Sequence, residues 1–126
     1  MANSSGEVFV LKTTDRAKGV PALLEKFDLG SYSEKKVALK ANYNSADPFP
    51  ASTNLDTLRA IVQGLKYAGA SGITLAERSG MGDTKQVLSE MGVLALAEEM
   101  GFKTIVLNDI GKEDWGKNRG KRNTLD

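Results

Sequence analysis

Short apolar runs separated by amphipathic stretches dominate the pattern of this sequence. Four runs have the length and composition of buried strands: residues 8–11, 36–41, 73–76 and 104–107. Apolar runs of this length, bounded by turn residues, favour strands over helices, which need about ten residues or more. The pattern therefore predicts about four short strands.

Helical spacing fills the stretches between these runs. The clearest helix is predicted to begin at Thr53, with Asp56 in a capping-box-like position, and to end at Gly69. Its apolar stripe consists of Leu55, Leu58, Ile61, Val62 and Leu65. A helix that ends near Phe27 is expected after the first run, and two short helices that end at Gly92 and Gly101 are expected after the third, with Thr84 as a cap.

Alternation of strands and helices implies crossover connections and a mostly parallel sheet. We therefore expect a three-layer, Rossmann-like α/β domain with helices on both faces of the sheet. Ligands of such folds lie beyond the carboxyl ends of the strands. Those ends fall at residues 12–15, 40–53, 77–84 and 108–109.

Length and net charge limit the number of domains and the class of protein, but they do not indicate a partner. The 126 residues suffice for one domain, expected at residues 7–110, after a disordered start at 1–6 and before a basic, flexible tail at 111–126. A net charge of +1 gives no broad basic surface, so nucleic acid is not favoured. No membrane span or signal peptide is apparent, and we expect a cytoplasmic protein.

The absence of both cysteine and histidine excludes most common catalytic groups. No disulfide, zinc ribbon, iron–sulfur cluster or Ser-His-Asp triad can be built from this chain. Carboxylates, Lys, Arg, Tyr, hydroxyls and backbone N–H groups remain. No cofactor is indicated, and the sequence leaves open whether the protein is an enzyme.

The polar loop at residues 42–52, which carries two prolines, is the first candidate site. Lys40, Asn42 and Asn44 offer polar groups for a ligand, and Ser52 and Thr53 place hydroxyls at a helix start, where anions are favoured. The competing interpretation is that the hydroxyls only cap the helix and Lys40 is a solvated strand end.

A glycine-rich turn after the third run is the second candidate. Its ligand-binding residues would be Arg78, Ser79 and Gly80. The turn lacks the third glycine of the dinucleotide fingerprint, because position 85 is Lys. Glu77 could act as a base or, with Asp47 and Asp83, as an oxygen ligand of a hard cation. A surface turn without a ligand is the competing interpretation.

Two features near the C-terminus do not carry a function. The segment 111–118 is similar to a P-loop, but Asn118 stands where Ser or Thr must reach magnesium, and too few residues follow for a helix. The overlapping tail, residues 116–126, carries the basic side chains Lys117, Arg119, Lys121 and Arg122. They lack interleaved aromatics, so a flexible tail is favoured over a nucleic-acid arm.

Taken together, several segments resemble the family called domain of unknown function 362. They are Lys40-Ala41-Asn42-Tyr43-Asn44, Pro50-Ala51-Ser52-Thr53, Gly69-Ala70 and Glu77-Arg78-Ser79-Gly80, and the resemblance extends over residues 8–108. Family members are longer, and some carry a ferredoxin-like domain. The resemblance thus implies an amino-terminal part, a shortened form or a minimal relative. Asn54 stands where many relatives have His, which argues against imidazole chemistry.

The layout is also similar, at the level of the fold, to the amino-terminal lobe of nickel-pincer lactate racemases. The first functional hypothesis is a small-ligand-binding domain, one lobe of an enzyme that acts on an anionic molecule. Lys40 would meet the anion and Glu77 would be the base, in a cleft completed by a second lobe or a second copy. The alternative is a non-catalytic scaffold or protein-interaction module.

Overall fold

A computed structural model gives the fold of residues 5–116. The helices are α1 (Arg16–Leu24), α2 (Leu55–Tyr67), α3 (Thr84–Glu90) and α4 (Val93–Met100), and the strands are β1 (Lys36–Leu39), β2 (Gly72–Glu77) and β3 (Lys103–Val106). Short 3-10 turns form η1 (Leu29–Tyr32), η2 (Leu107–Asp109) and η3 (Lys112–Asp114). Most of the predicted disordered start and of the basic tail lies outside the described residues.

The three strands form one parallel sheet in the order β1-β2-β3. Val37 lies opposite Ile73, and Leu75 lies opposite Leu39 on one side and Thr104 on the other. The predicted α/β class with a parallel sheet is therefore confirmed. The sheet has three strands rather than about four, because the first apolar run does not join it.

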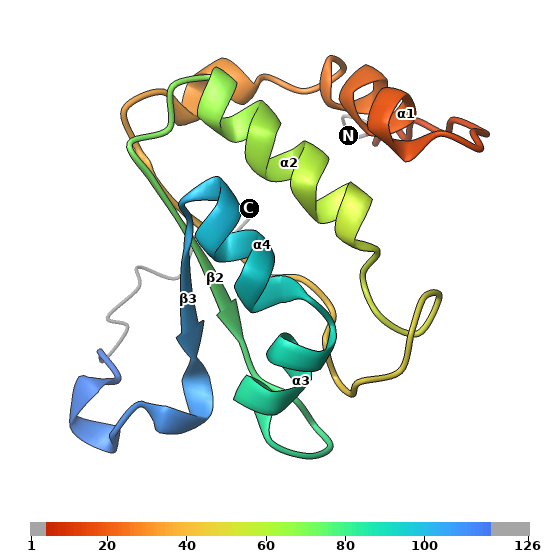
Figure 1. Ribbon diagram of the computed structural model, residues 1–126. Helices are drawn as coiled ribbons and strands as arrows, with labels where there is room; N and C mark the ends of the chain where they lie inside the picture. The colour runs from red at the N-terminus through yellow and green to blue at the C-terminus, as the bar shows by residue number, and fades with distance from the viewer. Residues whose placement is uncertain (1–4, 117–126) are drawn as a thin grey trace.

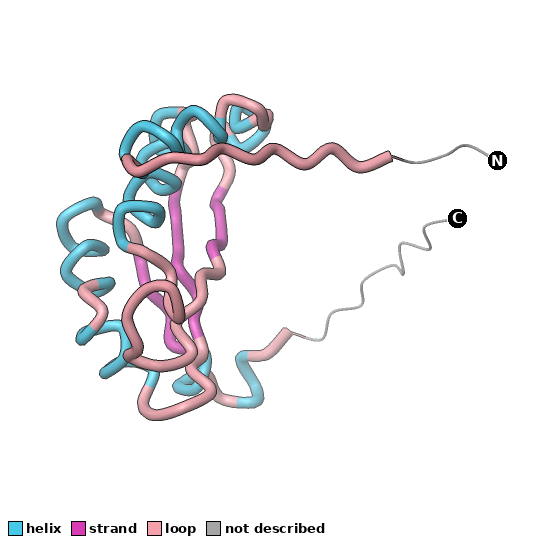
Figure 2. The backbone as a smooth tube through the Cα atoms, turned by 90° about the vertical axis from the view of Figure 1, so that its right-hand side faces the viewer, coloured by secondary structure: helices cyan, strands magenta, loops and turns pink. Residues whose placement is uncertain are grey.

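That run, residues 8–11, is an extended arm and not a strand. Val8 and Val10 are 85% and 89% exposed, and the arm touches the body through Phe9, whose ring packs edge-to-face on Phe27 at 5.8 Å. Figure 2 shows the arm leaving the body on the side away from the helices. A strand needs a hydrogen-bonding partner, and the arm has none among residues 5–116. Residues 12–15 therefore lead into α1, where Asp15 is the N-cap, and form no strand end.

The helices α2, α3 and α4 all lie on one face of the sheet (Figures 1 and 2). Successive right-handed crossovers between neighbouring strands place their helices on the same side. In β2, Ile73 and Leu75 are buried, whereas Thr74 and Ala76 on the other face are half-buried. The described residues thus form two layers instead of the expected three. We call the two faces of the sheet the covered face and the open face.

The core lies between the covered face and the helices. From α2 it takes Leu58, Val62 and Leu65, three of the five residues of the predicted apolar stripe. Each buried side chain of this kind stabilises the fold by roughly 1.5 to 3 kcal/mol relative to its exposed state. α1 packs against α2. No helix within residues 5–116 is long and apolar enough to span a membrane.

Candidate functional site

Two loops meet at the carboxyl ends of the strands, at the lower end of the sheet in Figure 1. The longer loop, residues 40–54, joins β1 to α2, and the shorter one, residues 78–83, joins β2 to α3. Both contain residues that the sequence places in a ligand site. We call this region the carboxyl edge.

An ion pair between Lys40 and Glu77 joins the ends of β1 and β2. Glu77, the last residue of β2, is fully buried, and its Oε1 accepts a hydrogen bond from the Ala41 N–H at 2.8 Å. Its Oε2 accepts one from Lys40 Nζ at 2.7 Å, while the Lys40 side chain remains 60% exposed. Lys40 Nζ also donates to the Ala41 carbonyl. The buried carboxylate therefore fixes an ammonium that solvent can still reach.

The predicted ligand residues Asn44, Ser79 and Gly80 are engaged in hydrogen bonds between the two loops. The Ser79 hydroxyl donates to the Tyr43 carbonyl at 2.7 Å, and the Gly80 N–H donates to Asn44 Oδ1 at 2.8 Å. A Cβ atom at Gly80 would collide with the Asn44 carboxamide, so this close approach requires glycine. These polar groups hold the two loops together.

The predicted hydroxyl pair also serves the fold. Thr53 Oγ1 accepts from the Asn42 N–H at 2.9 Å, and the Ser52 hydroxyl donates to the Ser45 carbonyl at 3.3 Å. The N-cap of α2 is Asn54, one residue later than predicted, and its Oδ1 accepts from the Asp56 N–H at 2.9 Å. The prediction that Thr53 caps this helix is therefore wrong, because its hydroxyl binds the Asn42 N–H within the loop instead.

The start of α3 is also displaced by one residue, but in the opposite direction. Asp83 is the N-cap and accepts from the Gln86 N–H at 2.8 Å, so the prediction of Thr84 as the cap is wrong. Thr84 is buried; its hydroxyl accepts from the Ser79 N–H at 2.9 Å and donates to Asn108 Oδ1 at 2.8 Å. This link connects the carboxyl edge to the segment after β3.

The three carboxylates considered as cation ligands have separate partners. Asp47 Oδ2 accepts from the Ser45 hydroxyl at 2.7 Å, Glu77 pairs with Lys40, and Asp83 caps α3. Residues 5–116 contain no group of three acidic side chains arranged to hold a metal ion. The carboxyl edge thus offers no assembled cation site in the described part of the chain.

Tyr43 is a core residue that the sequence placed in a polar loop. Its side chain is fully buried, and its hydroxyl donates to the Thr53 carbonyl at 3.1 Å. Burial, and secondarily the negative charge of Glu77, raise the pKa of Tyr43 to about 12. An aromatic ring among Asn and Ser residues was the available signal that this loop folds back onto the core.

The order of these segments is matched by a family model described as Domain of unknown function (DUF362), over residues 37–124. The chain belongs to the DUF362 family. The match begins in β1 and includes both loops of the carboxyl edge in this DUF362 domain. It starts later than the expected residue 8, leaving out the arm and α1, and it extends beyond residue 108.

The other two comparisons found nothing: no curated protein and no solved structure matches the chain. The fold-level likeness of this DUF362 domain to lactate racemases therefore stays a prediction. The family description assigns no activity to the carboxyl edge. Its chemistry has to be argued from its own residues.

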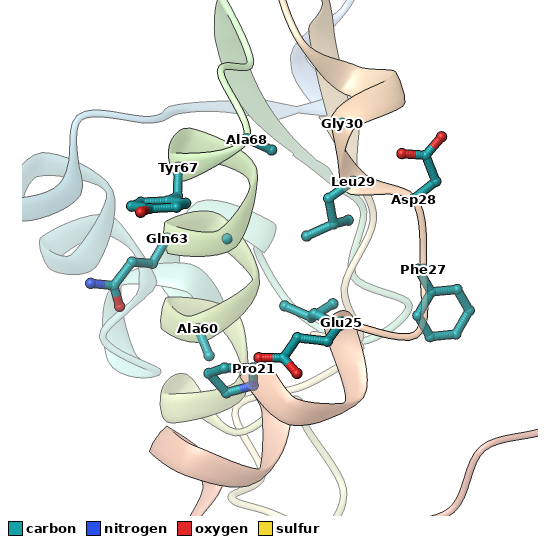
Figure 3. A pocket seen from close by; sticks show the side chains of 12 residues that line it. Pro21, Glu25, Phe27, Asp28, Leu29, Gly30, Ala60, Gln63, Tyr67 and Ala68 are labelled. Carbon is teal, nitrogen blue, oxygen red and sulfur yellow. The ribbon is translucent and has the colours of Figure 1, made fainter.

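Two surface pockets of residues 5–116 bear on the choice of site, and the larger of the two is remote from the carboxyl edge. It measures about 580 Å³ and lies between α1, η1 and α2, with Leu24, Leu29 and Ala60 among its apolar lining (Figure 3). Its charged lining residues are Glu25 and Asp28, so it offers no cation to an anionic ligand. Size favours this pocket, but the positive groups Lys40 and Arg78 favour the carboxyl edge.

A smaller pocket of about 280 Å³ lies beside the carboxyl edge. Asp83 and Glu90 contribute its charged groups, and Met81 and Val87 are among its apolar ones. Two carboxylates repel an anion. An anionic ligand at this edge would therefore lie on the side of Lys40 rather than in the smaller pocket.

Proposed function

We propose that this DUF362 domain binds a small molecule through an anionic group at the carboxyl edge. The Lys40–Glu77 ion pair carries the proposal. An ammonium has three N–H donors, and Lys40 directs one to Glu77 Oε2 and one to the Ala41 carbonyl. The third is free to meet a ligand oxygen, since the side chain is 60% exposed.

Arg78 supports the same site with a second positive charge. It follows Glu77 directly, is exposed, and takes part in none of the ion pairs of residues 5–116. Because Glu77 offsets part of the charge of Lys40, Arg78 contributes the excess charge. A carboxylate or phosphate can accept two parallel hydrogen bonds from its guanidinium.

Glu77 is a positioning residue in this proposal. Its two oxygens are occupied by Lys40 and the Ala41 N–H, and solvent does not reach it. A general base must lie within hydrogen-bond reach of the proton it removes. Glu77 can act as a base only in an enzyme whose second lobe displaces Lys40, so the proposal is binding, with catalysis dependent on that lobe.

A thermal-shift panel of phosphates and small carboxylic acids tests the proposal. A ligand that binds the folded state raises the melting temperature by mass action. We expect the shift caused by a bound ligand to disappear in Lys40→Met and to shrink in Arg78→Gln. The matched control is Lys85→Gln, an exposed lysine on α3, which should keep the full shift. Equal shifts in Lys40→Met and the unaltered protein would reject the site.

A second candidate function is protein interaction, favoured by the open face of the sheet. Parallel sheets are almost always covered on both faces, yet Ala38 and Ile105 are exposed here. A scaffold or interaction module would use this surface for a partner or a second copy. Sedimentation over a range of concentrations, with a dye that binds apolar surface, tests it. A monomer that binds no dye would argue against this function.

A further inference from the structure

The open face carries charge of one sign only on the strands of residues 5–116. From β1 it takes Lys36 and Ala38, because these alternate with the buried Val37. From β3 it takes Lys103 and Ile105 by the same alternation. The Cγ atom of Lys36 lies 4.0 Å from the position of a Cβ on Gly72, which places it on the β2 side of its strand. Lys40, exposed, follows at the carboxyl end.

Small side chains occupy the centre of the open face. The strand register aligns Ala38, Thr74 and Lys103 in one row, and Ala76 beside Ile105 in the next. Gly72 stands beside Lys36. The surface therefore has a flat, weakly polar centre between lysines on its two outer strands. A long side chain from a partner meets no obstruction in the central strand.

The arm extends this surface. Figure 2 shows that it leaves the body on the side of the open face, while α2, α3 and α4 lie on the opposite side. Its four apolar side chains are between 38% and 89% exposed. Exposed apolar groups gathered on one side of a domain mark an interaction site.

We propose that the open face binds an amphipathic α-helix of another polypeptide, with an apolar stripe flanked by Asp and Glu. This inference rests on the interaction function proposed above. A helix satisfies its own backbone hydrogen bonds, and helices are what cover parallel sheets. Acidic flanks would lie along Lys36 and Lys103, since complementary charge selects a partner.

A second copy of the chain is the less suitable occupant. Two open faces packed together would oppose lysine to lysine, because the charged positions of this face in β1, β2 and β3 are all lysines. The helical surface carries Arg59 and Glu99, which already pair with each other at 2.8 Å. Self-association by the open face therefore conflicts with its charge.

Two stapled helical peptides of about 18 residues test the proposal; each would be about 27 Å long. Both carry the same stripe of Leu and Ala, but one has Glu on its flanks and the other has Lys. Fluorescence anisotropy measures their affinity for the full chain, and amide chemical shifts of the labelled protein locate them. We expect the Glu peptide to bind, with shifts at Thr74, Ala76 and Ile105, and the Lys peptide to bind more weakly.

Charge reversal gives the decisive comparison. The double variant Lys36→Glu/Lys103→Glu should lower the affinity for the Glu peptide by about three- to tenfold, the effect expected from two solvent-exposed ion pairs. It should raise the affinity for the Lys peptide. Lys85→Glu, on the helical side, should change neither, and circular dichroism checks that each variant folds. Equal binding of the two peptides, or shifts confined to helical residues, would overturn the proposal.

Sedimentation separates the failure of this inference from that of the interaction function. If the chain dimerises through the open face and binds neither peptide, the interaction function is supported and the proposal of a helical partner is overturned. A monomer that binds neither peptide rejects both.

Discussion

The covered and the open face of one three-stranded sheet differ although they share the same backbone. On the covered face, Ile73 and Leu75 belong to the hydrophobic core and are almost inaccessible to solvent. On the open face, their neighbours Thr74 and Ala76 are half-buried, and Ile105 is 41% exposed. The core therefore lies on one face, and the described residues leave the other face largely uncovered. The following experiments test this division, from the largest expected effect to the smallest.

Substitutions on the two faces of β2 should lower the free energy of unfolding by very different amounts. We expect Leu75→Ala, on the covered face, to lower the free energy of unfolding by about 3 kcal/mol, because it removes a fully buried side chain and leaves a cavity. Thr74→Val, on the open face, should change it by less than about 0.5 kcal/mol. Urea denaturation measures both. Similar losses would mean that the open face is packed as well.

Alkaline pH should destabilise the folded protein through ionisation of the buried Tyr43. Its folded pKa of about 12 lies above the ordinary value of 10.0, so the neutral phenol favours folding. That contribution is complete below pH 10, declines as the pH rises from 10 to 12, and amounts to about 2 to 3 kcal/mol at most. The phenolate absorbance of the Tyr32→Phe/Tyr67→Phe variant follows Tyr43 alone. Ionisation with a midpoint near pH 10 would show that the ring is accessible in the folded state.

The ion pair of the buried carboxylate at the end of β2 should contribute more to the free energy of unfolding than Lys36 and Lys103 of the open face do. Lys40→Met leaves Glu77 with only the Ala41 N–H as a partner, and we expect a loss of about 2 kcal/mol. Lys36→Met and Lys103→Met should each stay within about 0.5 kcal/mol. Thermal unfolding compares the three variants. If the Lys40 variant is as stable as the others, the ion pair does not hold the carboxyl edge.

The smallest effect is expected on the outer surface of the helices. Arg59 donates two hydrogen bonds to the Glu99 carboxylate, and they lower the pKa of Glu99. The stabilisation is present above the unfolded pKa of this carboxyl and is lost as the pH falls through the lowered folded value. An NMR titration should show the Glu99 pKa rise in Arg59→Gln. Salt should weaken the pair, since both side chains are solvated.

Local patterns predicted the elements that depend on few contacts. The stripe of α2 and the glycines that end the helices are legible because spacing and backbone freedom act within one turn; Gly69, Gly92 and Gly101 all have positive φ. The strand propensity of residues 8–11 was misleading, since a strand forms only with a partner. In β2, the alternation of Ile and Leu with Thr and Ala was an available signal of one less apolar face, but we expected helices on both faces.

The candidate site was harder to predict, because polar side chains have several possible partners. The sequence brought Asn44, Ser79 and Gly80 to the same edge, which is where they lie. It did not show that Asn44 accepts from the Gly80 N–H or that the Ser79 hydroxyl donates to the Tyr43 carbonyl. Likewise the cap positions were displaced by one residue, because Thr53 and Thr84 are drawn to the N–H groups of Asn42 and Ser79. The partners of Asn44 and Ser79 depend on contacts between two loops that are distant in sequence, whereas the cap positions depend on how each loop folds back on itself.

The contact of Gly80 with Asn44 has a consequence for the entropy of any binding event at the carboxyl edge. Because this contact and the hydroxyl of Ser79 already order both loops, a ligand would not have to immobilise them, and little conformational freedom would be lost on binding. The same ordering of the loops limits selectivity between ligands, because few of their hydrogen-bond donors remain available to a ligand. Such an edge is suited to rapid recognition of one simple chemical group rather than to induced fit around a complex molecule.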